Sequence, residues 1–364
     1  MASGDMKLYG SRVSYYTGKL EAYLRYKGIA YSLHGMPYEK ADELKEKVGS
    51  VQMPIVDRGD GRWMSDTTPI LLELEKENPD NPIIPSDPIV GFIARLIEDY
   101  SDEWLWRSAM HYRWSYPYSR ELISNILVDE ISTPVPLPRF VVRRMIRRRQ
   151  IKFFTKRDGV NAATWSHVEQ GYLNALDCMS RILAERPFVL GTKPSLADFG
   201  LMAPMFRHFS QDPDPEEIMR TRAPLVYEWV ARMWTARSVE DGVFISEVSE
   251  EMAPLLKEVC ETHLQQLASN ASAYAGGKPS FEMTVQGCAY TDMPVSRYRV
   301  YCLECLRTSF DTLDAGAQQK VRSLLPYTEA DILWKDTLDA TSGYNADGHL
   351  PYGHAINVYG DGTP

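Results

Sequence analysis

The sequence contains no long apolar run and little cysteine. No apolar run approaches the roughly 18 residues that a membrane-spanning helix needs, so we expect no such helix. The first twenty residues lack a charged start followed by an apolar block, so we expect no secretory signal. Five cysteines among 364 residues are few and odd in number, which argues against a disulfide framework and favours a reducing cytoplasm.

Positive charge is also in deficit. The chain has 40 Lys and Arg against 49 Asp and Glu, a net charge of −9. General nucleic-acid binders are usually basic overall, so we expect no nucleic-acid partner. Hydrophobic residues make up 44% and charged residues 24%, as in soluble globular proteins. At about 150 residues per domain, the length predicts two or three domains.

Hydrophobic patterning over residues 7–84 predicts alternating strands and helices. Gly28 would end the first helix, and Gly59 and Gly61 mark a tight turn between the last two strands. The predicted strands are residues 7–13, 29–36, 53–57 and 62–65, and the predicted helices are residues 19–27, 41–48 and 69–77. The order β-α-β-α-β-β-α places two parallel strands and a hairpin in one small sheet with helices on its faces, an α/β fold.

Three short motifs lie beside these elements. Residues 14–19 (SYYTGK) join the first strand to the first helix, residues 52–55 (QMPI) open the third strand at a proline, and residues 66–70 (DTTPI) open the last helix. With these motifs in this order and spacing, residues 7 to about 85 resemble the thioredoxin-fold domain of the glutathione S-transferases, in particular the serine- and cysteine-type, bacterial-like members. The resemblance implies glutathione as co-substrate.

The resemblance also implies a hydroxyl that activates the glutathione thiol. A free thiol has a pKa of about 8.5, and lowering it by about two units needs roughly 2.7 kcal/mol of differential stabilisation. A hydroxyl that donates to the thiolate supplies about 1.5–3 kcal/mol, and a helix N-terminus adds up to about 2 kcal/mol. The family's catalytic position falls on Ser14, with Tyr15, Tyr16 and Thr17 as rivals; alternatively, Ser14 is only a turn residue. The sequence departs from the family at Tyr15, where proline is frequent, and at Gly18, where a bulkier residue is usual.

The same resemblance implies the residues that hold glutathione. Gln52, Met53 and Pro54 lie at its cysteinyl part, where a cis bond before Pro54 makes Met53 present its backbone N–H and C=O. Asp66 receives the ammonium of the γ-glutamyl group, and Thr67 with the start of its helix receives the carboxylate. Two other interpretations stay open: a trans proline at a strand start, and simple capping of the helix by Ser65, Asp66 or Thr67.

Four prolines mark a domain boundary after this segment, because they favour a rigid, extended linker. They are Pro79, Pro82, Pro85 and Pro88. Beyond them the pattern is mostly helical, with predicted helices at residues 89–112, 164–185, 196–209 and 225–235. Ser195 and Asp198 fit a capping box, an element that the family has in its C-terminal domain and that is structural there. We therefore expect a thioredoxin-like domain over residues 1–85 and an all-helical domain over residues 86–240.

The densest aromatic stretch is residues 100–118. The resemblance implies that the first helices of the helical domain face the glutathione site and bind the electrophile. Trp104, His111, Tyr112 and Trp114 are therefore candidate pocket residues, and the alternative is that they pack the helical core.

A basic insertion occupies residues 136–160. Residues 139–157 contain nine Lys or Arg with apolar residues between them. We interpret this segment as a solvated helix that pairs with the acidic remainder of the chain. The alternative is a helix that binds an anionic membrane surface or RNA.

Residues 241–364 extend beyond the two expected domains. Their pattern predicts helices at residues 252–273 and 295–325, a hairpin over residues 280–290 that turns at Gly287, and an irregular tail from Thr341. Cys302 and Cys305 form a single C-x-x-C with no second pair, so neither zinc nor another metal is expected. The extension carries no catalytic signature.

Together these observations favour a glutathione-dependent transferase. It would activate the glutathione thiolate for attack on a hydrophobic or aromatic electrophile, in conjugation or in a related lyase, dehalogenase or isomerase reaction. The resemblance implies a homodimer. The alternative is a non-catalytic binding or scaffold protein that reuses the fold.

Overall fold

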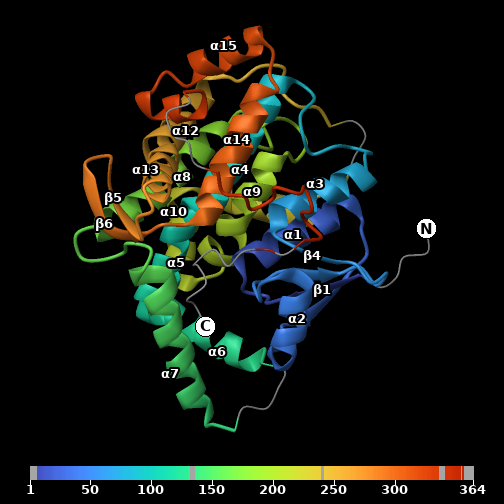
Figure 1. The fold of residues 1–364 in the computed structure, drawn as a ribbon, viewed down its shortest axis with the longest axis vertical. Coiled ribbons are helices and arrows are strands. Elements are labelled where there is room, and N and C mark those ends of the chain that lie inside the picture. Colours follow the sequence, from blue (N-terminus) through green and yellow to red (C-terminus); the bar gives the residue numbers. More distant parts are fainter. Residues whose placement is uncertain (1–5, 132–135, 239–241, 336–340, 354, 356–364) are drawn as a thin grey trace.

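A computed structural model describes residues 6–131, 136–238, 242–335, 341–353 and 355 (Figure 1). Its amino-terminal part is a four-stranded sheet in the order β2-β1-β3-β4. The strands are β1 (Lys7–Gly10), β2 (Ser32–Gly35), β3 (Ile55–Asp57) and β4 (Trp63–Ser65), and the helices are α1 (Tyr15–Lys27), η1 (Tyr38–Lys40), α2 (Ala41–Val48) and α3 (Thr67–Glu77). β1 and β2 are parallel and β3 and β4 form a hairpin, so the predicted order β-α-β-α-β-β-α is confirmed.

Side chains alternate between the two faces of this sheet, as the period of two along a strand requires. Leu8, Val56 and Met64 are opposite one another across three strands and pack with α1 and α3 in the main core. Tyr9 and Ile55 point to the other face, where α2 covers them. Both faces of the sheet are therefore covered by helices.

The middle of the chain is helical. It contains α4 (Pro88–Glu103), α5 (Leu105–Ser115), α6 (Pro117–Asp129), α7 (Arg139–Gln150), η2 (Ile151–Lys156), α8 (Trp165–Leu183), α9 (Leu196–Pro204), η3 (Met205–Phe209), α10 (Pro213–Arg222) and α11 (Pro224–Thr235). Four of these helices have proline in the first turn, where the missing N–H costs little: α4, α6, α10 and α11.

The prediction of one helix over residues 89–112 is wrong, because the chain breaks between α4 and α5 at Trp104. The indole of Trp104 packs edge-on against His167 and Tyr290, which lie on other elements. Neither proline nor glycine marks the break, so tertiary packing sets it.

The predicted capping box at the start of α9 is confirmed. The Asp198 carboxylate accepts the backbone N–H of Ser195 at 2.9 Å, the N–H of Val189 at 2.9 Å and the indole N–H of Trp229 at 3.1 Å. All of these groups are buried, so Asp198 holds a turn, a helix start and a core tryptophan together.

The extension consists of helices and one hairpin. It contains η4 (Glu250–Met252), α12 (Ala253–Glu258), η5 (Val259–Leu264), α13 (Gln265–Ala275), β5 (Ser280–Val285), β6 (Cys288–Pro294), α14 (Arg297–Asp311), α15 (Ala315–Leu324) and η6 (Thr328–Leu333). The predicted hairpin is confirmed, and Gln286 and Gly287 form its turn with positive φ. The predicted helix over 295–325 divides in two, because the Asp314 side chain caps α15 by accepting the Ala317 N–H.

The extension packs on the helical part, with α14 and α15 beside α4 and α12 beside α8 (Figure 1). Phe92 and Phe310 have ring centroids 5.8 Å apart, and Arg299 pairs with Glu103 at 3.2 Å. One hydrophobic core runs through all three parts of the chain. Among the described helices, none is both long and apolar enough to cross a membrane.

Candidate functional site

Three sequence motifs meet at one end of the sheet. The register pairs Tyr9 with Ile55 and Ile55 with Ser65, so the end of β1, the start of β3 and the end of β4 are adjacent. Ser14 follows β1, Pro54 precedes β3 and Asp66 follows β4. The candidate site residues of the amino-terminal part therefore converge, although they lie far apart in the sequence.

Ser14 is the N-cap of α1. Its hydroxyl accepts the backbone N–H of Thr17 at 3.3 Å, which satisfies one of the free donors at the start of the helix. A hydroxyl that accepts one hydrogen bond keeps its own proton for another acceptor. Ser14 therefore has a donor available beside the positive end of a helix dipole, the arrangement that a thiolate needs.

The three rival hydroxyls are placed differently. Tyr15 is buried and donates to the backbone carbonyl of Ser101 at 2.5 Å, and Tyr16 donates to the carbonyl of Asp102 at 3.0 Å. Thr17 is fully buried under Gly10. Burial raises the pKa of Tyr15 well above its ordinary value, which disfavours a phenolate there.

The loop before Ser14 is held by two residues of the helical part that the sequence analysis missed. Arg113 donates to the carbonyl of Val13 at 2.5 Å and is itself held by Asp212 at 2.7 Å. Glu130 accepts the backbone N–H of Arg12 at 3.0 Å. Nothing in the local sequence signals these contacts, because each joins residues about a hundred positions apart.

The peptide bond between Met53 and Pro54 is cis, as the resemblance implied. Among the residues that the structure describes, none hydrogen-bonds to the backbone N–H or C=O of Met53. Both groups are therefore available to pair with a peptide ligand. Gln52 lies beside them and donates to the Ser50 hydroxyl at 2.9 Å.

Asp66 has a left-handed backbone, with φ of 71°, and leads into α3. Its side chain makes no cap bond to the helix, so the predicted alternative of simple capping by Asp66 is wrong. Thr67 is the first residue of α3, and no side chain caps the start of this helix. Burial raises the pKa of the Asp66 carboxyl to about 7, against the hydrogen bond from Tyr298 and the charge of Lys19, which both lower it.

A buried ion cluster joins α1, α3 and α4 behind this site. Lys19 pairs with Glu98 at 2.6 Å and with Asp102 at 2.5 Å, and it donates to the Thr68 hydroxyl at 3.2 Å. Burial lowers the pKa of Lys19, but Asp102 and Glu98 outweigh it and leave the lysine charged. The cluster fixes the start of α1 against the start of α3, and the sequence analysis did not identify it.

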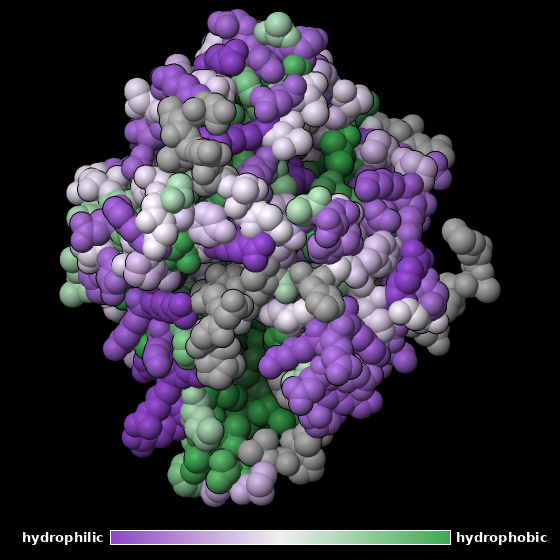
Figure 2. Space-filling model, in the orientation of Figure 1, coloured by the Kyte–Doolittle hydropathy of each residue, from purple (hydrophilic) through white to green (hydrophobic). Residues whose placement is uncertain are grey.

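An apolar cluster adjoins the Ser14 loop. Its buried members are Val13, Met110, Trp114 and Ile123, with Trp106, Ile126, Leu127, Ile146, Ile151 and Phe154 packed against them. Figure 2 shows an apolar hollow in this region of the surface, between α7 on one side and the amino-terminal part on the other. Apolar surface next to the Ser14 hydroxyl suits an apolar ligand whose reactive atom faces that hydroxyl.

The four predicted pocket residues do not line one common pocket. Trp114 belongs to the apolar cluster with Val13. Trp104 instead contacts Arg107 and the extension hairpin, His111 is buried with Glu169 at 3.3 Å, and Tyr112 stacks on Tyr116. The structure therefore brings Trp114 alone of the four into the cluster beside Ser14.

The basic segment forms α7 and η2. On its inner face, Arg143 and Arg147 pair with Glu121 at 3.2 and 2.5 Å, and Arg139 pairs with Asp129. Pairing with acidic side chains, as predicted, thus holds for these three arginines. The segment also supplies Ile146, Ile151 and Phe154 to the apolar cluster, a role that the sequence analysis did not assign.

Comparison with known families matches two parts of the chain. The sequence profile of the glutathione S-transferase N-terminal domain matches residues 8–82, and that of the glutathione S-transferase C-terminal domain matches residues 161–232. The chain thus contains both domains of the glutathione S-transferase family. Both matches fall in the parts that carry the motifs and the capping box, and neither includes the basic insertion or the extension.

Several solved structures of the family are similar to this chain at low identity. The Tau class glutathione S-transferase from mango, Mangifera indica, is 18% identical, with 71% of this chain and 100% of that one covered and a TM-score of 0.42. Beta-etherase LigF from Sphingobium sp. strain SYK-6 is 20% identical, with coverage of 63% and 94% and a TM-score of 0.44. A glutathione S-transferase from Methylobacterium radiotolerans JCM 2831, in complex with glutathione sulfonate, is 20% identical, with coverage of 68% and 98% and a TM-score of 0.41. These likenesses are too distant to assign a reaction, and no curated protein matches the chain.

The extension reaches the candidate site at Asp66. The Tyr298 hydroxyl lies 3.0 Å from both carboxylate oxygens of Asp66, and the carbonyl of Pro351 accepts the Ser65 N–H at 3.1 Å. Further along the tail, the N–H of Ala355 donates to the carbonyl of Val48 at 2.8 Å. The sequence analysis did not identify Tyr298, Pro351 or Ala355 as the residues that make these contacts.

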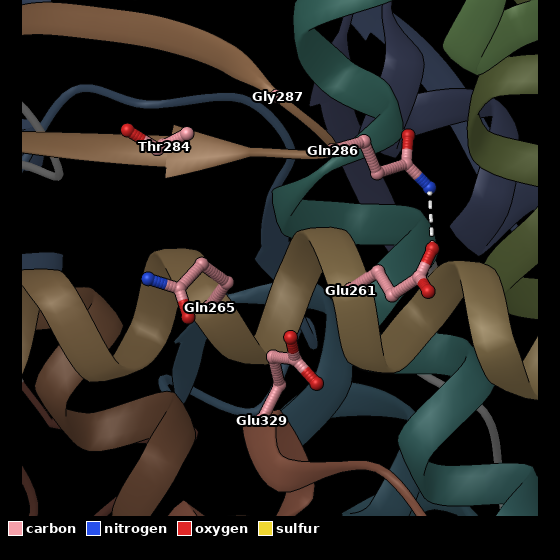
Figure 3. Close-up of a pocket in the computed structure, with 6 residues that line it drawn as sticks. All are labelled: Glu261, Gln265, Thr284, Gln286, Gly287 and Glu329. Carbon is pink, nitrogen blue, oxygen red and sulfur yellow. Dashed lines mark hydrogen bonds between the residues drawn. The ribbon is translucent and has the colours of Figure 1, made fainter.

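A separate cavity of about 350 Å³ lies within the extension (Figure 3). Its lining residues are Glu261, Gln265, Thr284, Gln286, Gly287 and Glu329. Gln286 donates to Glu261 at 3.1 Å across it. None of the candidate site residues lines this cavity, so it is distinct from the site around Ser14.

Proposed function

We propose that this protein is a glutathione-dependent transferase in which Ser14 stabilises the glutathione thiolate. The observation that carries the proposal is the Ser14 hydroxyl, which caps α1 and keeps its proton for a ligand. The unpaired backbone of Met53 and the open start of α3 at Thr67 fit the peptide and carboxylate of glutathione. Asp66 fits its ammonium.

In the proposed reaction, the thiol loses its proton to solvent and the sulfur attacks an electrophilic carbon. A C–S bond forms, and the leaving group departs with the electron pair of the bond that breaks. Ser14 donates to the thiolate before attack and so lowers the thiol pKa. The apolar cluster around Val13 and Trp114 would hold a hydrophobic or aromatic electrophile. A cytoplasmic location, expected from the sparse cysteines, and a homodimer, implied by the family resemblance, belong to the same proposal.

The test compares two substitutions of Ser14. Ser14→Ala removes both the hydroxyl and the helix cap, whereas Ser14→Gly removes the hydroxyl and costs only a few tenths of a kcal/mol as a cap. We expect both to lower kcat/KM with an activated aryl chloride by about 10- to 100-fold, since a hydrogen bond to a charged group contributes about 1.5–3 kcal/mol. Ser32→Ala, on the far edge strand, is the matched control. Unchanged turnover in both Ser14 variants would refute the assigned role.

A second candidate is a non-catalytic binding protein that uses the outer face of α7 and η2. Four exposed cations lie four residues apart there and form no ion pair within the described part of the chain: Arg144, Arg148, Lys152 and Lys156. Phe140, on the same side, is 64% exposed. Binding of anionic vesicles at about 150 mM salt, with no heat on titration of glutathione, would favour this candidate.

A further inference from the structure

Tyr298 of α14 contacts the one carboxylate that the proposed function assigns to the glutathione ammonium. Its hydroxyl is 3.0 Å from each oxygen of Asp66. A tyrosine hydroxyl has a single proton, so it donates to one oxygen at a time. The other oxygen stays able to accept from a second donor, and the plane of the carboxylate is fixed.

The tail holds Tyr298 in place. The rings of Tyr298 and Tyr344 pack edge to face, with centroids 5.5 Å apart. Tyr344 donates its backbone N–H to the Ser342 hydroxyl at 3.1 Å, and that hydroxyl in turn donates to Glu304. The orientation of Tyr298 therefore depends on contacts within the extension.

The tail also holds the residue before Asp66. The carbonyl of Pro351 accepts the Ser65 N–H, and the hydroxyl of Tyr352 accepts from Arg58 at 2.9 Å and from Arg62 at 3.2 Å. Among the described residues of the extension, none hydrogen-bonds to the backbone of Met53 or to the N–H groups in the first turn of α3.

We propose that Tyr298 is a positioning residue of the glutathione site, which orients the Asp66 carboxylate toward the γ-glutamyl ammonium and so makes the extension part of that site. This inference rests on the proposed function. The matched family domains end before the extension, and this inference gives the extension a specific role in the site.

The charged groups around Asp66 make the role measurable by pH. Lys19 of α1 faces it as a cation, Glu98 and Glu103 of α4 face it as like charges, and Tyr298 faces it as a hydrogen-bond donor. Burial has the largest effect and raises the pKa of Asp66 to about 7, while Tyr298 lowers it. Loss of the Tyr298 hydroxyl should therefore raise the pKa of Asp66 further.

The experiment is a calorimetric titration of the full chain with reduced glutathione between pH 5.5 and 8. Affinity should fall as the pH falls through about 7, because the ammonium needs an ionised partner. In Tyr298→Phe we expect a Kd at pH 7 about tenfold higher and a pH midpoint shifted upward by about one unit, the effect of one hydrogen bond to a charged group. We expect kcat at saturating glutathione to change less than twofold.

Tyr301→Phe is the matched control, since Tyr301 lies on the same helix and packs on the same Tyr344 with centroids 4.7 Å apart. It should leave both Kd and the pH midpoint unchanged. If Tyr298→Phe fails to fold, Ser342→Ala loosens the support of Tyr298 and should shift both quantities in the same direction by less.

Three results would overturn the inference. Normal binding by Tyr298→Phe removes the positioning role and leaves the proposed function intact. Weaker binding with an unshifted pH midpoint indicates a purely structural contribution and also contradicts it. Absence of binding by the unsubstituted chain and by every variant contradicts the proposed function, and the inference with it.

Discussion

The side chain of Arg207 passes directly over Gly18. A β-carbon on residue 18 would lie 2.4 Å from Cγ of Arg207. Arg207 has little freedom to withdraw, since its guanidinium pairs with Glu21 at 2.7 Å. This contact explains the glycine in the first turns of α1, one of the two departures from the family pattern.

Gly18→Ala should therefore destabilise the protein. Alanine is favoured over glycine inside a helix by about 1 kcal/mol, but overpacking typically costs about 1–3 kcal/mol. We expect a net loss in the free energy of unfolding by urea. Gly171→Ala is the matched control, because a β-carbon there would meet its nearest neighbour, Ser108 Oγ, at 3.4 Å. Equal stability of Gly18→Ala and the parent chain would show that Arg207 moves aside.

Asp198→Asn should be strongly destabilising. The amide would turn an N–H toward a site where the carboxylate now accepts from Ser195, Val189 and Trp229. Each buried donor left without a partner costs about 1–3 kcal/mol, so we expect a loss of more than about 2 kcal/mol in urea unfolding. Asp87→Asn is the control, because Asp87 caps α4 and asparagine caps about equally well. A loss no greater than in this control would contradict the assignment.

The apolar cluster should bind apolar ligands through its inner-face side chains. Phe154 contacts the Trp106 ring edge-on, with centroids 5.5 Å apart. Truncation of a phenyl ring removes about 1–3 kcal/mol of apolar contact, so Phe154→Ala should weaken binding of an aryl fluorescent dye severalfold or more. Phe140→Ala, on the outer face of α7, should leave binding unchanged. Equal dye affinity in both variants would place the ligand elsewhere.

Asp66 should make stability depend on pH in the direction opposite to most carboxylates. Its pKa is about 7 in the folded protein and about 3.9 when unfolded, so the folded chain binds this proton more tightly. The stability that protonated Asp66 contributes is complete below about pH 4 and is lost as the pH rises to about 7. Asp66→Asn should raise Tm more at pH 8 than at pH 5, relative to the parent chain. Asp80→Asn, an exposed control, should show no such difference. An equal change in Tm at pH 5 and at pH 8 for Asp66→Asn would contradict the burial of the Asp66 charge.

Much of the fold could be predicted because its signals are local. The helix over 41–48 and the turn at Gly287 depend on spacing and on turn residues, and both are confirmed. The break at Trp104 was missed because no proline or glycine accompanies it. The division at Asp314 was missed although an aspartate cap is a local signal, since the apolar pattern continues across it.

The site was only partly predictable for the same reason. The positions of Ser14, Met53 and Asp66 follow from motifs of four to six residues. Arg113 and Tyr298 act on these positions across 100 and 232 residues of sequence, and nothing near either one signals a partner. The apolar cluster draws its members from the loop before α1 and from α5, α6, α7 and η2, so the candidates from one aromatic stretch included Trp114 alone of its buried members.

The shared core has a consequence for how the chain is made. Leu8 of β1, Phe199 of α9 and Leu306 of α14 belong to one continuous cluster. During synthesis, the face of α4 that meets Phe310 stays uncovered until that residue has left the ribosome. The amino-terminal and helical parts thus emerge with exposed apolar surface that the last hundred residues cover. A nascent chain that stalls before α14 is therefore a natural client for a chaperone.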